Sequence, residues 1–128
     1  MPESGRFSNT ASSGNLYRQR YFKDATFEAL RIIEPVVQKH NLTLLETAFR
    51  WVLHHSKLNV TDGNDGIIIG VSSEAQLEGN LKDLEKGPLP EEVVKALDEA
   101  WLVAKPTTAN YWHKDLAYTY DTKKALKL

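Results

Sequence analysis

The sequence of 128 residues contains no cysteine. Disulfide bonds, a thiolate nucleophile and a zinc site with thiolate ligands are therefore excluded, and the composition suits a reducing compartment. The sequence also has no excess of basic residues, because 16 Lys and Arg face 17 Asp and Glu, for a net charge of -1. Nucleic acids and anionic membranes bind basic surfaces, so we expect neither as a partner.

Long apolar runs are absent as well. The longest are far shorter than the roughly 20 residues that a membrane-spanning helix needs. The residues after Met1 are polar and rich in Ser, Asn and Gly, unlike an apolar leader segment. With 41% hydrophobic residues, the sequence is typical of a single globular domain, and we expect a cytoplasmic location.

Apolar residues at helical spacing and capping signals predict four helices. Thr43 with Glu46, and Ser73 with Gln76, have the spacing of capping boxes. The predicted helices cover residues 25–39, begin at Thr43 and Ser73, and run from Pro90 to about residue 104.

One segment predicts a strand. The run from Ile67 to Val71 is short, apolar and rich in β-branched residues, which is typical of a strand buried on both faces in a parallel sheet. The chain is thus expected to consist of a loop (1–24), a helix-helix-strand-helix-helix region (25–104) and a C-terminal tail (105–128). A lone strand needs neighbours, so either another chain supplies them or the chain is part of a larger α/β architecture.

The strongest candidate site is the turn from this strand to the next helix. Gly70 allows a ligand to approach the backbone, Ser72 and Ser73 carry hydroxyl groups, and the first N–H groups of the helix favour an anion such as phosphate. The alternative is that Ser73 and Gln76 only cap the helix. Spacing alone leaves both interpretations open.

Other polar residues offer weaker candidates. The segment from Tyr17 to Tyr21 alternates aromatic and cationic residues, which suits a carboxylate or phosphate ligand but equally a solvated surface. His54 and His55 are adjacent and point about 100° apart on a helix, so they cannot ligate one metal together. No two carboxylates form an evident acid and base pair. We therefore predict no metal site and no catalytic residue from the residues alone.

Several segments resemble the aldo-keto reductase family, specifically its aflatoxin aldehyde reductase-like group. The similarity covers nearly the whole chain. It is carried by residues 70–81 (GVSSEAQLEGNL) and by the segments 5–7, 16–22, 45–51 and 110–112.

The resemblance implies an α/β fold: the C-terminal part of a (β/α)8 barrel, mostly helical in this chain, with one buried strand. It implies an NADPH-dependent reduction of an aldehyde or ketone. Carried over by position, Tyr17 and Arg20 bind the substrate. The residues that bind NADPH, mainly at its adenosine 2′-phosphate end, are Arg6, Gly70, Ser72, Ser73, Gln76 and Asn80.

A complete barrel needs roughly 250 residues, about twice this length. The resemblance therefore implies a truncated chain without the family's catalytic Asp, Tyr, Lys and His. Such a chain is expected to be inactive alone and to bind NADPH weakly or not at all.

Two alternatives remain. In the first, the chain is a non-catalytic interaction protein, because apolar helix faces and an unpaired strand are otherwise exposed. It then docks on a full-length reductase, a complementary barrel fragment or another copy of itself. Alternatively, it is a free-standing four-helix domain.

Overall fold

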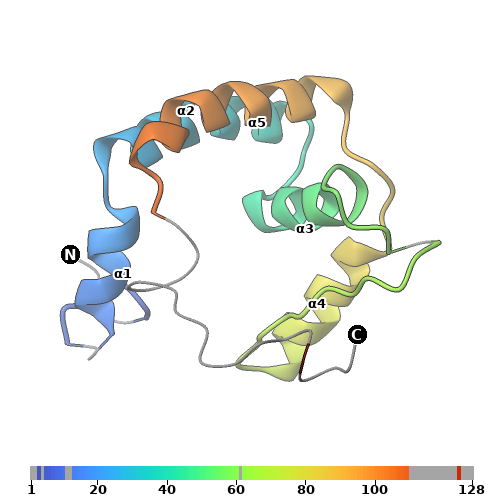
Figure 1. The fold of residues 1–128 in the computed structure, drawn as a ribbon, viewed down its shortest axis with the longest axis horizontal. Coiled ribbons are helices and arrows are strands. Elements are labelled where there is room, and N and C mark those ends of the chain that lie inside the picture. Colours follow the sequence, from blue (N-terminus) through green and yellow to red (C-terminus); the bar gives the residue numbers. More distant parts are fainter. Residues whose placement is uncertain (1–2, 4, 11–12, 61, 110–123, 125–128) are drawn as a thin grey trace.

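The computed structural model describes residues 3, 5–10, 13–60, 62–109 and 124, so most of the predicted tail lies outside the described residues. Over these residues the chain is helical, without a strand (Figure 1). None of these helices has the length and apolar character needed to cross a membrane. The elements are α1 (Gly14–Tyr21), α2 (Asp24–Lys39), α3 (Leu44–His54), α4 (Glu74–Leu84), α5 (Glu91–Ala104) and a 3-10 helix, η1 (Lys105–Thr107).

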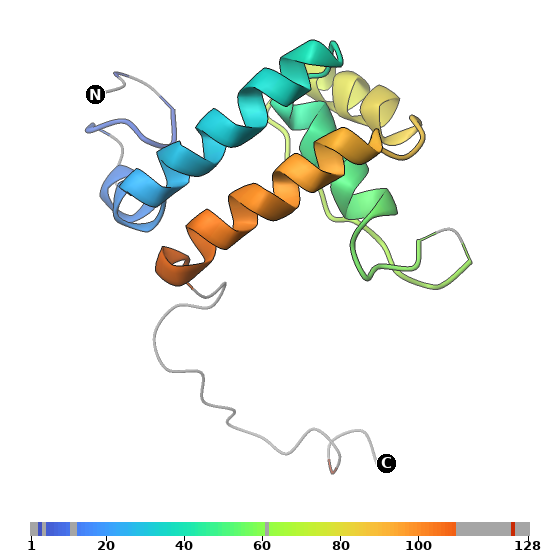
Figure 2. The same cartoon turned by 90° about the horizontal axis from the view of Figure 1, so that it is seen from above.

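The helices α2 and α5 lie side by side and antiparallel (Figure 2). Small buried residues, Ala29 on α2 and Ala96 and Ala100 on α5, allow the two backbones to approach closely. At one end of the pair, Lys39 Nζ lies 2.6 Å from the carboxylate of Glu92. The helix α2 contacts α3, and α4 packs against α3 from the other side (Figure 1).

A small apolar core lies where α2, α3 and α5 meet. Val37 of α2, Val93 of α5 and Leu89, just before α5, are buried, and Val93 has no exposed surface. Trp51 of α3 packs against this cluster. The remaining residues that pack on it are half-buried: Ile33, Val36, Leu42, Val94 and Leu97.

Two predicted helix starts are confirmed. The Thr43 hydroxyl accepts a hydrogen bond from Glu46 N at 3.0 Å, which caps α3. The Ser73 hydroxyl accepts one from Gln76 N at 3.3 Å, which caps α4. Each cap satisfies an N–H group that has no partner within its helix.

The predicted buried strand at Ile67–Val71 is wrong. The segment forms no strand, and Ile68 is fully exposed, at 101% of its reference surface. The physical reason is that a strand exists only through hydrogen bonds to a neighbour, and no described segment pairs with this one.

The predicted loop 1–24 contains a helix. The helix α1 covers residues 14–21, at the end of this region. Gly14 is buried, and a Cβ atom there would lie 1.9 Å from the carbonyl oxygen of Ser8. Only glycine fits, and Arg18 donates from Nη1 to Phe7 O and Ser8 O, both at 2.8 Å. The helix is therefore fixed by the preceding loop.

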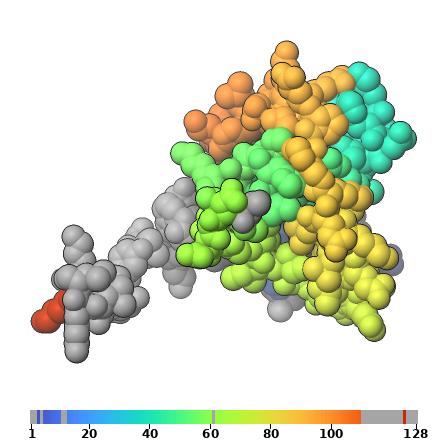
Figure 3. Space-filling view, turned by 90° about the vertical axis from the view of Figure 1, so that its right-hand side faces the viewer, coloured from blue at the N-terminus to red at the C-terminus, as the bar shows by residue number. Residues whose placement is uncertain are grey.

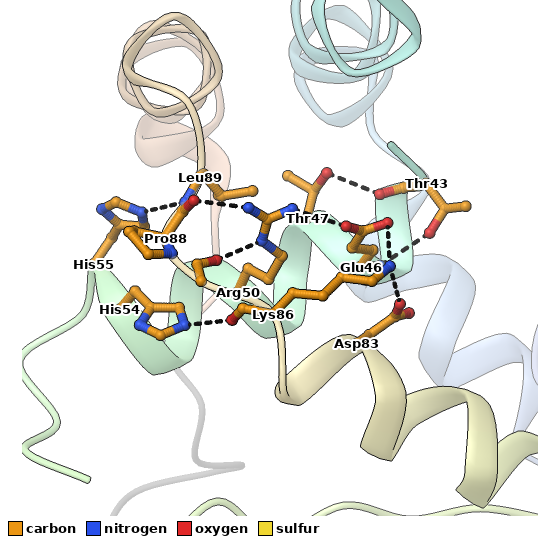
Figure 4. A network of polar contacts seen from close by, with 11 residues as sticks. Thr43, Glu46, Thr47, Arg50, His54, His55, Asp83, Lys86, Pro88 and Leu89 are labelled. Carbon is orange, nitrogen blue, oxygen red and sulfur yellow. Dashed lines mark hydrogen bonds and ion pairs between the residues drawn. The ribbon is translucent and has the colours of Figure 1, made fainter. Parts of the chain in front are cut away.

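The connection from α4 to α5 is held by polar side chains of α3 and of His55, which directly follows α3 (Figure 4). His54 Nε2 donates to Lys86 O at 2.8 Å, and Leu89 N donates to His55 Nε2 at 2.9 Å. Arg50 donates to the two carbonyl groups between them, those of Gly87 and Pro88, both at 2.7 Å. We call these contacts the α3 clasp. In the space-filling view this connection rises against α3 from α4 to α5 (Figure 3).

The burial pattern predicts a contrast between two substitutions. Val93→Ala removes two methyl groups from a fully buried position and should lower the free energy of unfolding by about 1–3 kcal/mol. Ile68→Asp, at a fully exposed position, should change it by less than about 0.5 kcal/mol. Urea unfolding followed by helical circular dichroism measures both. If Ile68→Asp lowers the free energy of unfolding more than Val93→Ala does, the core is not centred on Val93.

The α3 clasp predicts a dependence of stability on pH. Burial lowers the pKa of His55 from its ordinary 6.5, with smaller contributions from His54 and Arg50. The unfolded chain therefore binds this proton at a higher pH than the folded chain does. As a result, the free energy of unfolding should fall from about pH 7 to about pH 5.

His55→Gln provides the control for this prediction. Its amide oxygen can still accept from Leu89 N but does not titrate. Urea unfolding at several pH values should show a flatter profile for the variant than for the native chain. Equal slopes would mean that His55 does not contribute.

Candidate functional site

The turn that leads into α4 is shaped by its own side chains. Ser73 caps the helix, and the side-chain oxygen of Gln76 accepts from both the backbone N–H and the hydroxyl of Ser72, each at 3.0 Å. The side-chain oxygen of Gln76 accepts from Ser72, while its amide nitrogen can donate to a ligand. The Ser73 hydroxyl, which accepts from Gln76 N, retains its proton. The turn therefore presents donors, as an anion requires.

A second segment, the loop before α1, lies opposite the turn that leads into α4. Gly5 has a φ of +82°, in the left-handed region that favours glycine, and Arg6 follows it. Ser8, in the same loop, is 1% exposed, and Arg18 holds its carbonyl group. The loop that carries Arg6 is thus anchored on α1.

The two segments line one cavity of about 610 Å³. Four of the predicted cofactor-binding residues line it: Arg6, Gly70, Ser72 and Gln76. More than 60 positions of the sequence separate Arg6 from the other three. Sequence reasoning missed three further described lining residues: Gly5, Ser13 and Val71. Gly5 and Val71 adjoin predicted residues, whereas Ser13 precedes a helix that was not predicted, so no signal identified it.

Two predicted cofactor residues do not line this cavity. Ser73 lies between Ser72 and α4 and is exposed, one position from the lining. Asn80 lies further along α4 and is buried, with 7% of its surface exposed. A ligand contact with Asn80 stays a prediction, and its burial in this structure leaves little surface for one.

The predicted substrate residues lie in an aromatic and cationic cluster on α1. Tyr17 and Tyr21 stack with ring centroids 6.3 Å apart, and Phe7 meets the edge of Tyr17 at 6.0 Å. The Arg6 guanidinium lies 6.0 Å from the Tyr17 ring, and that of Arg20 lies 6.0 Å from the Tyr21 ring. Tyr17 therefore contacts the arginine of the cavity.

The cavity has the chemistry of an anion-binding site. The Arg6 guanidinium supplies a permanent positive charge, and the start of α4 supplies N–H groups and hydroxyl donors. No carboxylate is among its described lining residues. Across the part of the chain that the structure describes, no group of three His, Asp or Glu residues is placed to hold a metal ion.

Comparisons with known proteins agree on one family. The sequence profile described as the Aldo/keto reductase family matches residues 3–102. An aldo-keto reductase from Pseudocercospora fijiensis is 46% identical over 86% of this chain and 37% of its own length. Aflatoxin B1 aldehyde reductase member 2 from Rattus norvegicus is 39% identical over 88% of this chain and 31% of its own length.

The matches cover most of this chain but only part of the length of each relative. The chain spans about a third of the length of the relatives that it matches, while the family profile covers most of the chain. The resemblance seen in the segments 5–7, 16–22, 45–51 and 70–81 falls within the matched residues. The chain belongs to the aldo/keto reductase family.

Proposed function

We propose that the chain forms the C-terminal part of an NADPH-dependent (β/α)8 reductase and binds the adenosine 2′-phosphate end of the cofactor. The observation that carries the proposal is the shared cavity of Arg6 and the start of α4. A phosphate monoester carries close to two negative charges near neutral pH, and a guanidinium beside a helix N-terminus complements that charge.

Three residues of the cavity, together with Ser73 beside it, have roles in this proposal. Arg6 pairs with the phosphate, and the Gln76 amide nitrogen donates to its oxygen atoms. The hydroxyl of Ser73, which is exposed one position from the lining, adds a further donor. Gly70 leaves room at the backbone, because a Cβ atom there would meet nothing within 4 Å. When bound, NADPH supplies the hydride that reduces a carbonyl carbon. The residues of this cavity hold the opposite end of the cofactor, which carries the adenosine 2′-phosphate.

The substrate side of the proposal rests on α1. Tyr17 and Arg20 lie on the same helix, and Tyr17 reaches Arg6 through the cation–π contact. We place an aldehyde or ketone substrate beside them. Reduction also requires a proton donor, which we assign to residues of the whole reductase beyond this third of its length. We therefore expect the 128-residue chain to show no turnover alone.

A second candidate function is supported by an apolar cleft of about 390 Å³, between α3 and the segment before α4, which meets the first cavity at Gly70. Phe49 and Val52 of α3 line it together with Ile67, Ile68 and Ile69. Such a surface suits docking on a complementary barrel fragment or a full-length reductase. The two functions predict different cofactor binding, because docking alone gives no preference for a cofactor with a 2′-phosphate.

The proposal predicts a preference between cofactors. NADPH should bind the chain about tenfold or more tightly than NADH, because only NADPH carries the 2′-phosphate. Ser73→Ala should remove most of that preference while leaving NADH binding unchanged. Isothermal titration calorimetry measures the four dissociation constants. Equal affinity for NADPH and NADH would contradict the proposal and favour docking.

A pair of glycine substitutions tests the approach of the ligand to the backbone. Gly70 borders the cavity and Gly79 lies within α4, and neither Cβ atom would meet another atom within 4 Å. Gly70→Ala should weaken NADPH binding about tenfold or more without lowering stability, since a methyl group takes space at the ligand. Gly79→Ala should leave binding unchanged and stabilise α4 by up to about 1 kcal/mol. Unaltered NADPH affinity in Gly70→Ala would show that the ligand does not approach this backbone.

A further inference from the structure

Arg50 occupies the centre of the α3 clasp (Figure 4). Its side chain is 12% exposed and uses three nitrogen atoms. Nε and Nη2 donate to the carbonyl groups of Gly87 and Pro88, and Nη1 lies 2.8 Å from Glu46 Oε1. A guanidinium is the only side-chain group that offers this planar fork of donors with a fixed charge.

The same carboxylate also joins the clasp to α4. Lys86 Nζ lies 3.1 Å from Glu46 Oε2 and 2.8 Å from Asp83 Oδ1, near the end of α4. Glu46 is buried, so its charge needs both cations close by. Loss of Arg50 alone leaves Glu46 paired with Lys86, which allows an Arg50 variant to fold.

Apolar packing contributes little to the placement of α4. Of its three leucines, Leu77 and Leu81 are 38% and 48% exposed and Leu84 is half-buried, and among the described helices α4 packs mainly against α3. A half-exposed leucine gains only part of the stabilisation of full burial. The orientation of α4 therefore depends on the polar contacts at its C-terminal end.

The opposite end of α4 is the start that borders the cavity. The helix has 11 residues and spans about 16 Å, and it contains no proline, so it transmits a tilt at one end to the other. The loop that carries Arg6 is held independently, by Arg18 of α1 through Phe7 O and Ser8 O, and the Arg6 guanidinium lies against Tyr17 of α1. The separation between Arg6 and the donors at Ser73 and Gln76 is thus set by the angle at which α3 holds α4.

We propose that Arg50 is a positioning residue for the phosphate site: its fork on Gly87 and Pro88 sets the angle of α4 and so places Ser73 and Gln76 opposite Arg6. Arg50 acts through the backbone of residues 87–88 and does not touch the ligand. The inference rests on the proposed function, because it concerns the same cavity.

The test uses two small probes, adenosine 2′,5′-bisphosphate and adenosine 5′-monophosphate, which differ by the 2′-phosphate. Arg50→Met keeps an unbranched stem and removes both the fork and the charge, and Arg50→Lys keeps the charge without the fork. Both should weaken binding of the bisphosphate about tenfold and change binding of the monophosphate much less. Calorimetry provides the affinities, and circular dichroism verifies the helix content of each variant.

Lys39→Met is the matched control. Lys39 also bonds across two helices, to Glu92, but touches neither α4 nor the clasp. It should leave the affinity for both probes unchanged. Native affinity in Arg50→Lys, or an equal loss in Lys39→Met, would overturn the positioning role.

Ser73→Ala separates the two proposals. If it binds the bisphosphate as tightly as the native chain does, the phosphate site itself is wrong. If Ser73→Ala weakens binding and Arg50→Met does not, the site stands and only the positioning role fails.

Discussion

The arrangement of the helices depends on the backbone groups of residues 86–89, which need hydrogen-bond partners away from any regular helix. Arg50 and His54 of α3, with His55 directly after it, supply partners to these four consecutive residues. The apolar core is small, centred on Val37, Leu89 and Val93, and Leu89 belongs both to this core and to the clasp. Polar and apolar contacts thus hold one connection, which fixes α4 below α3 and leads α5 onto α2 (Figure 1).

The candidate site follows from that placement. The start of α4 faces a loop that α1 anchors, so two segments more than 60 residues apart meet at one cavity. Each segment supplies a different part of the required chemistry, because the turn at Ser72 and Ser73 lacks a charge and the loop at Arg6 lacks the N–H groups of a helix start. Their combination suits a phosphate.

Sequence reasoning succeeded where the determinants were local. The caps at Thr43 and Ser73 join residues three positions apart, so their spacing was sufficient. It failed at Ile67–Val71, because a strand requires partners that no local pattern supplies. It also failed at α1, which depends on the contacts of Arg18 and Gly14 with residues 7 and 8. The gathering of Arg6 with Gly70 was expected only from the family resemblance, since composition and spacing do not place distant segments together.

Whether Arg6 and the start of α4 share one phosphate ligand is measured most directly by nuclear magnetic resonance. A ¹⁵N-labelled chain is titrated with adenosine 2′,5′-bisphosphate, and the amide signals report where the ligand binds. The largest shifts are expected at residues 5–6 and 70–76, with the same dissociation constant for both segments, because both line one cavity. Shifts confined to one segment, or centred on the apolar cleft at Phe49 and Ile67, would contradict a shared phosphate site.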